Sequence, residues 1–265
     1  MNAQAAGDTP VTAMLVANGI SKSFDGFKVL DDVSFAVPPR GLTGIVGTNG
    51  AGKSTLFAVV SGQLTADHGR VSFDAADISA LSPARRARRG LGRTFQVPRE
   101  FSHLTVRENF LVAAQRDYGE TLRSVFIGWG RVAREEHAVG ERADRWIEFL
   151  NLRAVVHNAA GDLSGGQKKL LELGRMLMLE PKCILLDEPF AGVNPVLVDE
   201  ISTRIRELNE SHGIAFVIIE HHLEALKALA RHLYVMDQGR VIAEGEPATV
   251  LAQPRVLEAY MGGVI

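Results

Sequence analysis

The sequence predicts an α/β fold built on a mixed, mainly parallel sheet with helices on both of its faces. Two short segments with apolar interiors, 182–187 and 215–219, are typical of parallel strands that are buried on both faces. A helix predicted from Pro195 follows the first of them, with apolar residues at three- and four-residue spacings. Strands that alternate with such helices define an α/β architecture. With 265 residues, of which 46% are hydrophobic, the chain can bury a substantial core.

An antiparallel β region is predicted near the N-terminus. Residues 1–13 are small and polar and are interpreted as a flexible tail. Segments 14–20 and 29–37 have the composition of strands, and an Asp-Gly pair at 25–26 lies between them as a turn. A further short strand is expected at 69–73.

Between residues 98 and 165 the pattern becomes mostly helical. The segment 132–152 places its apolar residues on one helical face, namely Ala143, Trp146, Ile147 and Leu150. We therefore expect an inserted helical subdomain over 98–165. The α/β core is then formed by 14–97 and 166–265.

The composition excludes several classes of function. Because 29 Lys+Arg stand against 31 Asp+Glu, bulk charge gives no reason to expect nucleic-acid binding. Cys183 is the only cysteine, which excludes an intrachain disulfide and fits a reducing compartment. Residues 1–13 do not resemble a signal peptide, and no apolar run approaches the ~18 residues that span a bilayer. We expect a cytoplasmic protein that reaches a membrane only through partners.

Residues 47–54 carry the Gly-x-x-x-x-Gly-Lys-Ser pattern of a phosphate-binding loop, the P-loop. An apolar segment, 42–46, precedes the loop, and a helix-compatible segment, 56–60, follows it. The glycines let backbone N–H groups turn toward an anion, and the helix adds its positive N-terminal end. Lys53 can reach the β- and γ-phosphates of a nucleotide, and the Ser54 hydroxyl can ligate Mg²⁺.

Two acidic residues end the predicted strand at 182–187. Asp187 can hold Mg²⁺ through water, and Glu188 can polarise the water that attacks the γ-phosphate. Adjacent side chains on a strand diverge, so one carboxylate can serve the metal and the other the water. A GTPase would also need a base-reading Asn-Lys-x-Asp motif, which the sequence lacks.

These motifs and the segment Leu163-Ser164-Gly165-Gly166-Gln167 resemble those of ABC transporter ATPases. The likeness runs from about Met14 to the end of the chain. Segment 163–167 is identical to the family signature, and 47–55 matches the family's P-loop except for Thr48, where proline is usual. The resemblance implies that ATP is bound by Phe24, Gly47, Asn49, Gly50, Ala51, Gly52, Lys53, Ser54, Thr55, Ser164, Gly165, Gly166 and Gln167.

The same resemblance implies the catalytic roles. Glu188 matches the catalytic glutamate, His221 the switch histidine that contacts the γ-phosphate, and Gln96 the glutamine that touches Mg²⁺ and water and joins the two lobes. The metal ligands implied are Ser54, Gln96 and Asp187. Phe24 stands where an aromatic residue stacks on adenine, with Phe27 as a substitute.

Two residues depart from the family pattern. Asn194 replaces the more common aspartate of the D-loop at 191–195, and His222 replaces an acid that often follows the switch histidine. The first departure puts a charge-dependent contact between subunits in doubt.

The glycine-rich signature precedes a predicted helix, so Ser164 and the amides of Gly165 and Gly166 form a second helix N-terminus directed at phosphate. One chain carries one P-loop and one signature. The resemblance implies that the signature of one subunit closes over the ATP held by the P-loop of another. The partner subunit is either a second copy or a related ATPase, arranged head to tail around two ATP molecules.

Several segments resemble ATPases of branched-chain amino acid importers: 92–96, 101–109, 194–195 and 259–262. Segment 23–28 is similar to urea importer ATPases, and the lipopolysaccharide-export ATPase is a third relative. The importer resemblance implies integral membrane permease subunits as partners, a periplasmic solute-binding protein acting indirectly, and a peripheral location at the cytoplasmic face of the inner membrane. A soluble ABC ATPase for cofactor assembly is the alternative of another class.

The segment 84–89 is expected to form a polar helix and 90–96 a strand. The basic cluster near them is interpreted as a solvated helix face, and consists of Arg85, Arg86, Arg88, Arg89 and Arg93. Cys183 is interpreted as a packing residue.

Overall fold

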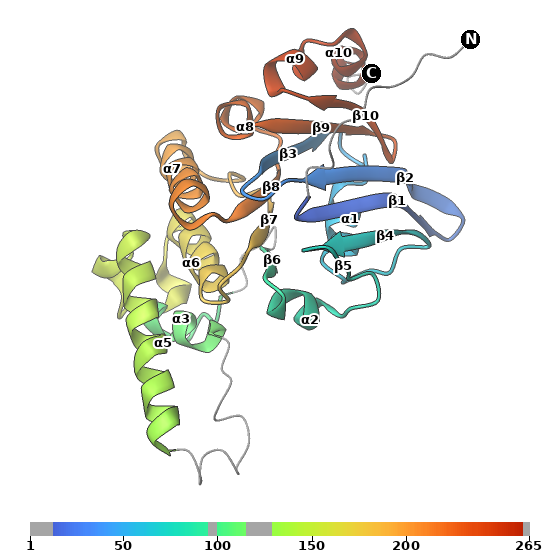
Figure 1. Cartoon of the computed structure of the whole chain (residues 1–265). Helices are drawn as coiled ribbons and strands as arrows, with labels where there is room; N and C mark the ends of the chain where they lie inside the picture. Colours follow the sequence, from blue (N-terminus) through green and yellow to red (C-terminus); the bar gives the residue numbers. More distant parts are fainter. Residues whose placement is uncertain (1–12, 95–99, 115–128, 262–265) are drawn as a thin grey trace, which may run out of the picture.

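A computed structural model describes residues 13–94, 100–114 and 129–261 of the chain. All of the predicted tail except Ala13 lies outside the described residues. The expected fold class is confirmed, because the chain forms two sheets covered by helices (Figure 1).

A six-stranded sheet lies at the centre, with the strand order β10-β9-β3-β8-β7-β6. All neighbouring strands in it are parallel except β9 and β10, which form an antiparallel pair near the C-terminus. Its strands are β3 (Leu42–Gly47), β6 (Leu91–Arg93), β7 (Cys183–Asp187), β8 (Ala215–Ile219), β9 (His232–Asp237) and β10 (Arg240–Gly245).

The second sheet is antiparallel and has the order β2-β1-β4-β5. Its strands are β1 (Leu15–Phe24), β2 (Phe27–Val37), β4 (His68–Phe73) and β5 (Ala76–Asp77). The Asp-Gly turn at 25–26 is confirmed, since both residues have positive φ, the conformation that such a turn requires. The N-terminal β region is therefore present as predicted.

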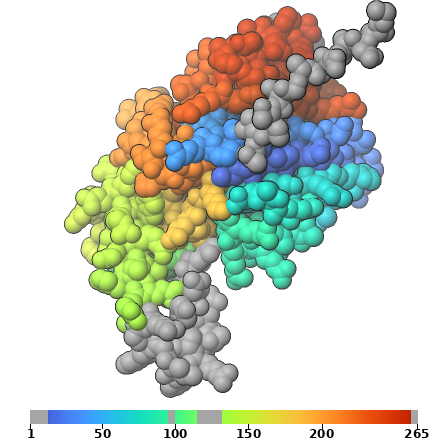
Figure 2. Space-filling model, viewed as in Figure 1, coloured from blue at the N-terminus to red at the C-terminus, as the bar shows by residue number. Residues whose placement is uncertain are grey.

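The helices of the core are α1 (Lys53–Val60), α2 (Pro83–Arg88), α7 (Pro195–His212), α8 (Leu223–Leu229), α9 (Pro247–Leu251) and α10 (Pro254–Met261). The helical part that follows the gap at 95–99 contains α3 (Val106–Ala113), α5 (Trp129–Phe149) and α6 (Gly165–Leu177). In Figure 2 helix α5, in yellow-green, and the antiparallel sheet, in blue to teal, lie on different sides of the molecule.

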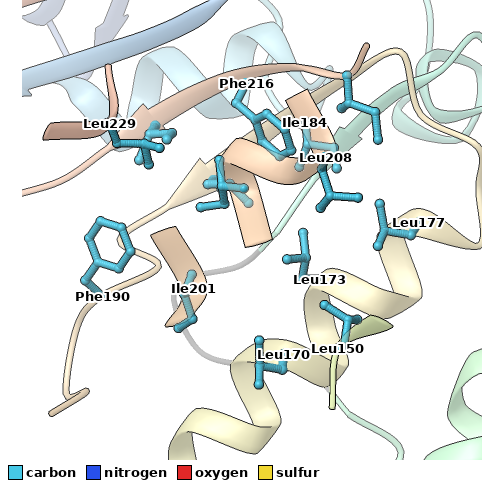
Figure 3. Close-up of a cluster of buried hydrophobic side chains, with 14 of the residues drawn as sticks. Leu150, Leu170, Leu173, Leu177, Ile184, Phe190, Ile201, Leu208, Phe216 and Leu229 are labelled. Atoms are coloured by element: carbon cyan, nitrogen blue, oxygen red, sulfur yellow. The ribbon is translucent and has the colours of Figure 1, made fainter. Parts of the chain in front are cut away.

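The central sheet is buried on both faces, as its apolar strands predict. Along β8, Val217 and Ile219 belong to one hydrophobic cluster, which also contains α1 and the antiparallel sheet. Phe216 and Ile218 point to the opposite face and join a second cluster with α6 and α7 (Figure 3). Successive residues of one strand thus serve two cores.

The second cluster continues from the sheet into the helical part. Ile184 of β7, Leu173 of α6 and Leu150 after α5 are all buried within it (Figure 3). Helices α3 and α6 approach closely at Gly174. A Cβ at this position would lie 2.2 Å from the ring of Phe110. Packing is continuous between the sheet and the helical part and marks no boundary between them. The subdomain limits at 98 and 165 therefore stay a prediction.

Candidate nucleotide-binding site

The P-loop runs from the buried end of β3 to the start of α1 and requires two of its glycines for close packing. A Cβ at Gly47 would lie 2.1 Å from the carbonyl oxygen of Met236, and one at Gly52 would lie 2.7 Å from the carbonyl oxygen of Val29. Gly52 is the N-cap of α1 and makes no side-chain cap. The first N–H groups of α1 are therefore left for an anion.

Lys53 is buried, and its Nζ donates hydrogen bonds to the carbonyl oxygens of Gly47 and Thr48, at 2.9 Å each. Burial lowers the pKa of Lys53 from its usual value, while the charges of Glu188 and Asp187 oppose that shift. Lys53 and the adjacent pair Asp187 and Glu188, which are distant from it in sequence, thus share one electrostatic environment. A cation held inside the loop suits a ligand with several negative oxygens.

Contacts from the C-terminal part of the chain hold the loop in place, which the sequence alone did not indicate. Thr48 Oγ1, at the position where proline is usual, donates to Asp237 Oδ1 at 3.0 Å. The N–H of Gly239 donates to the carbonyl oxygen of Ala51 at 3.2 Å. Burial raises the pKa of Tyr260 on α10 to about 12, against the effect of a hydrogen bond with the Gly47 backbone.

Asp187 lies at the end of β7 with one oxygen paired and one free among the described residues. Its Oδ2 accepts a hydrogen bond from Arg93 Nη2 at 2.9 Å, whereas its Oδ1 is buried and has no hydrogen-bond partner in the described part of the chain. A buried oxygen without a donor fits a cation or its water shell. Ser54 on α1 is exposed. Both residues fit the predicted magnesium site.

A magnesium site of this kind does not need a dense cluster of protein ligands. Mg²⁺ is usually held by one or two carboxylates together with waters and substrate phosphates. Within the described ranges, no group of three or more His, Cys, Asp or Glu side chains is arranged to hold a metal. The third predicted ligand, Gln96, lies outside the described residues.

The interpretation of the basic cluster was wrong for two of its arginines. Arg86 is 2% exposed and donates to four backbone carbonyls, those of Val59, Val60, Ser79 and Leu81. Arg93 lies on β6 and connects Asp187 to Ser61 Oγ and Gln63 Oε1, at 3.1 and 3.0 Å. Both side chains tie the C-terminal end of α1 to its surroundings, so neither belongs to a solvated helix face.

Glu188 and His221 follow neighbouring strands and meet. His221 Nε2 lies 3.2 Å from Glu188 Oε1. Glu188 adopts a left-handed backbone conformation with φ of 51°, which costs a non-glycine residue about 1–3 kcal/mol and is typical of functional sites. Its N–H donates to the carbonyl oxygen of Ile219 at 2.9 Å, and Lys169 Nζ donates to its carbonyl oxygen at 3.2 Å.

The signature is satisfied within its own helix. Ser164 Oγ accepts from the N–H of Gln167 at 3.3 Å, and Gln167 Oε1 accepts from the N–H of Ser164 at 3.0 Å, which is a capping box. A Cβ at Gly166 would lie 1.5 Å from Leu197 on α7, whereas one at Gly165 would meet open space. Among the described residues, the signature makes no hydrogen bond or ion pair with the P-loop of its own chain.

The two departures from the family pattern have a local structural role. Asn194 is the N-cap of α7, and its Oδ1 accepts from the N–H of Leu197 at 3.0 Å. His222 is the N-cap of α8, and its Nδ1 accepts from the N–H of Ala225 at 3.2 Å. Each side chain can therefore begin a helix without carrying a charge.

Phe24 and Phe27 face each other across the tip of the β1–β2 hairpin and are 42% and 74% exposed. Lys22 Nζ lies 5.5 Å from the centre of the Phe24 ring. Strand β2 adjoins the P-loop close to the hairpin tip, since the carbonyl oxygen of Val29 faces Gly52. Both rings are thus available for stacking on a planar ligand, and the choice of Phe24 stays a prediction.

A phosphate-binding loop after β3, an acid pair after β7 and a histidine after β8 define a P-loop nucleotide-binding protein. The chain belongs to the ABC transporter family, which matches residues 30–191. A second family, described as branched-chain amino acid ATP-binding cassette transporter, matches residues 240–264. The chain is therefore an ABC ATPase, an ATP-hydrolysing subunit of a transporter.

Relatives that align over nearly the whole chain support this family assignment. Two are named probable branched-chain amino acid transport ATP-binding protein LivG. The one from Methanocaldococcus jannaschii is 44% identical and covers 94% of this chain and 97% of its own, and the one from Archaeoglobus fulgidus is 42% identical and covers 94% and 95%. The lipopolysaccharide export system ATP-binding protein LptB of Haemophilus influenzae is 34% identical and covers 94% and 98%.

Solved structures show the same fold. A nucleotide-free ATP-binding cassette from an ABC transporter has a TM-score of 0.82 and 43% identity, and covers 94% of this chain and 99% of its own. An ADP-bound form of such a cassette has a TM-score of 0.82 and 44% identity, with 95% and 99% covered. Within the described ranges, no helix is long and apolar enough to cross a membrane.

Proposed function

We propose that the chain powers uptake of branched-chain or other hydrophobic amino acids as the ATP-hydrolysing subunit of an importer. The observation that carries the choice of solute is the family match over residues 240–264. This segment includes β10, α9 and α10, and Tyr260 within it lies close to the P-loop backbone at Gly47. The names of the LivG relatives support the same choice.

In this proposal the P-loop holds the phosphates of ATP. Lys53 leaves the loop carbonyls to bind the β- and γ-phosphates, and the N-terminus of α1 adds its N–H groups. Ser54, Asp187 and Gln96 would hold Mg²⁺, which when bound neutralises phosphate charge. Arg93 bonds Oδ2 of Asp187, so that Oδ1 would be the oxygen left to hold the metal. Phe24 stacks on the adenine.

Hydrolysis needs a positioned water and a group that accepts its proton. Glu188 polarises this water, and His221 contacts the γ-phosphate and orients Glu188. The 3.2 Å contact between His221 and Glu188 supports these roles, as does the interaction of the Glu188 charge with Lys53. The remaining half of the site is supplied by Ser164 and the amides around Gly166 of a second ATPase subunit. ATP then joins two subunits head to tail, and its hydrolysis releases them.

The partners proposed are integral membrane permease subunits, which would hold the chain at the cytoplasmic face of the membrane. A periplasmic solute-binding protein acts indirectly by delivering the solute to the permease. The helical part near Gln96 is the expected docking region, where Phe101 is 46% exposed. Lipopolysaccharide export is the second candidate function, because the LptB relative is 34% identical over nearly the whole chain.

The test is to purify the chain from membranes with its partners and to measure ATP hydrolysis in lipid nanodiscs. Addition of a solute-binding protein loaded with leucine, isoleucine or valine should stimulate hydrolysis severalfold, while lipopolysaccharide should not. Stimulation by lipopolysaccharide alone would support the second candidate. Partners that are all soluble would contradict both transport functions.

A further inference from the structure

A buried glutamate, Glu220, joins the two loops of the hydrolytic site. It is 3% exposed and lies between the end of β8 and His221. Its Oε1 accepts a hydrogen bond from the N–H of Phe190 at 2.7 Å. Its Oε2 accepts from the N–H groups of His221 and His222, at 2.9 and 3.1 Å.

The three donors belong to two separate loops. Phe190 lies two residues after Glu188, immediately before the D-loop. His221 and His222 lie in the short loop after β8, and His222 is the N-cap of α8. The strands β7 and β8 already bring these loops together, and the N–H of Glu188 bonds the carbonyl oxygen of Ile219. Glu220 extends the connection beyond the strands by one side chain.

We propose that Glu220 is a positioning residue that sets the distance between Glu188 and His221. The proposal rests on the hydrolytic roles proposed above for those two residues. Glu188 stands in a left-handed conformation that must be held by its surroundings. Fixing Phe190 on one side and His221 on the other with the same carboxyl group limits the movement of both. A mutual shift of about 1 Å can cost on the order of a hundredfold in rate.

The chemistry of the contact requires glutamate. Three backbone donors converge on two oxygens, and both oxygens must accept. Glutamine offers one accepting oxygen and presents an NH₂ group, a donor, to the other loop. Aspartate keeps both oxygens but is one methylene shorter, so it can reach only one of the two loops. A buried N–H left without an acceptor is costly, which will displace the loop that loses its bond.

The deciding experiment compares Glu220→Gln with wild type in the full-length chain, by steady-state ATP hydrolysis and equilibrium ATP binding. We expect kcat to fall about tenfold or more, because a well-positioned base contributes on the order of 10²–10⁴ to the rate. The Kd for ATP should stay within about threefold, because in the described part of the chain the Glu220 carboxyl group makes no hydrogen bond with the P-loop. Hydrogen exchange followed by NMR should show the amides of Phe190, His221 and His222 protected in wild type. At least one of the two loops should lose that protection in the variant.

Glu246→Gln is the matched control. Glu246 also accepts backbone N–H groups with both oxygens, from Ala248 and Thr249, but it caps α9 away from Glu188. This control should leave kcat unchanged. Glu220→Asp gives the same test if the glutamine variant does not fold.

Two results would overturn the role of Glu220. One is an unchanged kcat, and the other is a loss of ATP affinity in parallel with kcat, which would indicate a general structural defect. Either result leaves the importer function standing, since that depends on permease partners and on solute stimulation. Conversely, a chain without permease partners that shows the kcat loss would keep the role of Glu220 and reject import.

Discussion

The two phosphate-directed helix ends of this chain are supported in different ways. The P-loop before α1 is held by distant parts of the chain, since Thr48 bonds Asp237 and the backbone of Ala51 bonds Gly239. The signature before α6 is held by its own reciprocal cap between Ser164 and Gln167. The first site is therefore built by the fold of the chain around it. The second is a local, self-contained helix end, which suits a group that is offered to another subunit.

Removing the cation from the P-loop should have the largest effect. Lys53→Ala removes the only P-loop side chain that can pair with the β- and γ-phosphates. We expect ATP affinity to fall about a hundredfold or more, since hydrogen bonds to charged groups are worth about 1.5–3 kcal/mol each. Isothermal titration with ATP measures this loss, and unchanged affinity would show that the phosphates bind elsewhere.

Removing the catalytic carboxylate of Glu188 should separate ATP binding from ATP turnover. Glu188→Gln keeps the size of the side chain and loses the base, so ATP should bind normally while kcat falls about a hundredfold or more. The trapped ATP should accumulate a closed dimer on size-exclusion chromatography. Normal turnover would reject Glu188 as the base, and a variant that stays monomeric with ATP would reject the two-subunit site.

A negative charge at the signature should leave the stability and ATP affinity of the monomer unchanged but lower hydrolysis by the dimer. Gly165 is exposed, a Cβ there meets open space, and an acidic residue in the first turn of α6 favours the helix. Gly165→Glu should keep the melting temperature and ATP affinity of the chain but lower hydrolysis about tenfold or more by repelling the partner's ATP. Gly165→Gln, of the same size and without charge, is the control and should lose less activity than the glutamate variant, which isolates the effect of the charge. Loss of ATP affinity in the monomer would mean that the signature serves its own P-loop.

The contacts that hold the P-loop should have smaller effects. Thr48→Val removes the hydrogen bond to Asp237 with little change in volume, which costs about 1 kcal/mol and should weaken ATP binding about fivefold. Tyr260→Phe removes the phenol hydroxyl that lies close to the Gly47 backbone and should weaken ATP binding less. Differential scanning fluorimetry with and without ATP measures both. Equal affinities in all three proteins would mean that the loop is rigid without these contacts.

The pKa of Tyr260 gives a related pH test. Because its folded pKa is raised to about 12, the stability that it contributes is complete below the unfolded value near 10 and is lost as the pH rises toward 12. Wild type should therefore lose stability across this window more steeply than Tyr260→Phe. Parallel curves of stability against pH for the two proteins would show that Tyr260 does not have a raised pKa in the folded chain.

Much of the fold followed from local patterns. Apolar strands such as β7 and β8, the Asp-Gly turn and the glycines of the P-loop are determined by short-range chemistry, and all lie where predicted. Cys183 is buried, and burial raises the pKa of its thiol to about 12, in agreement with a packing role.

The misinterpreted or missed residues depend on distant backbone groups. Arg86 reads as a surface residue because four arginines surround it in sequence, and its carbonyl partners come from α1 and from the loop before α2. Thr48 and Glu220 owe their roles to partners 189 and 30 residues away. No periodicity in the sequence reports such pairs. The sequence shows Asn194 and His222 only as departures from the family pattern, and the structure adds their helix-capping hydrogen bonds.

The most direct test of a site shared between two subunits is to mix two inactive variants. Lys53→Ala lacks a working P-loop and Gly165→Glu lacks a working signature, so each dimer of identical copies has no intact site. A mixed head-to-tail dimer has one site with both defects and one site that is intact. If the variants exchange freely, mixing equal amounts should restore about a quarter of wild-type hydrolysis, because half of the dimers are mixed and each has one of two sites. No recovery from dimers shown to be mixed would contradict the shared site.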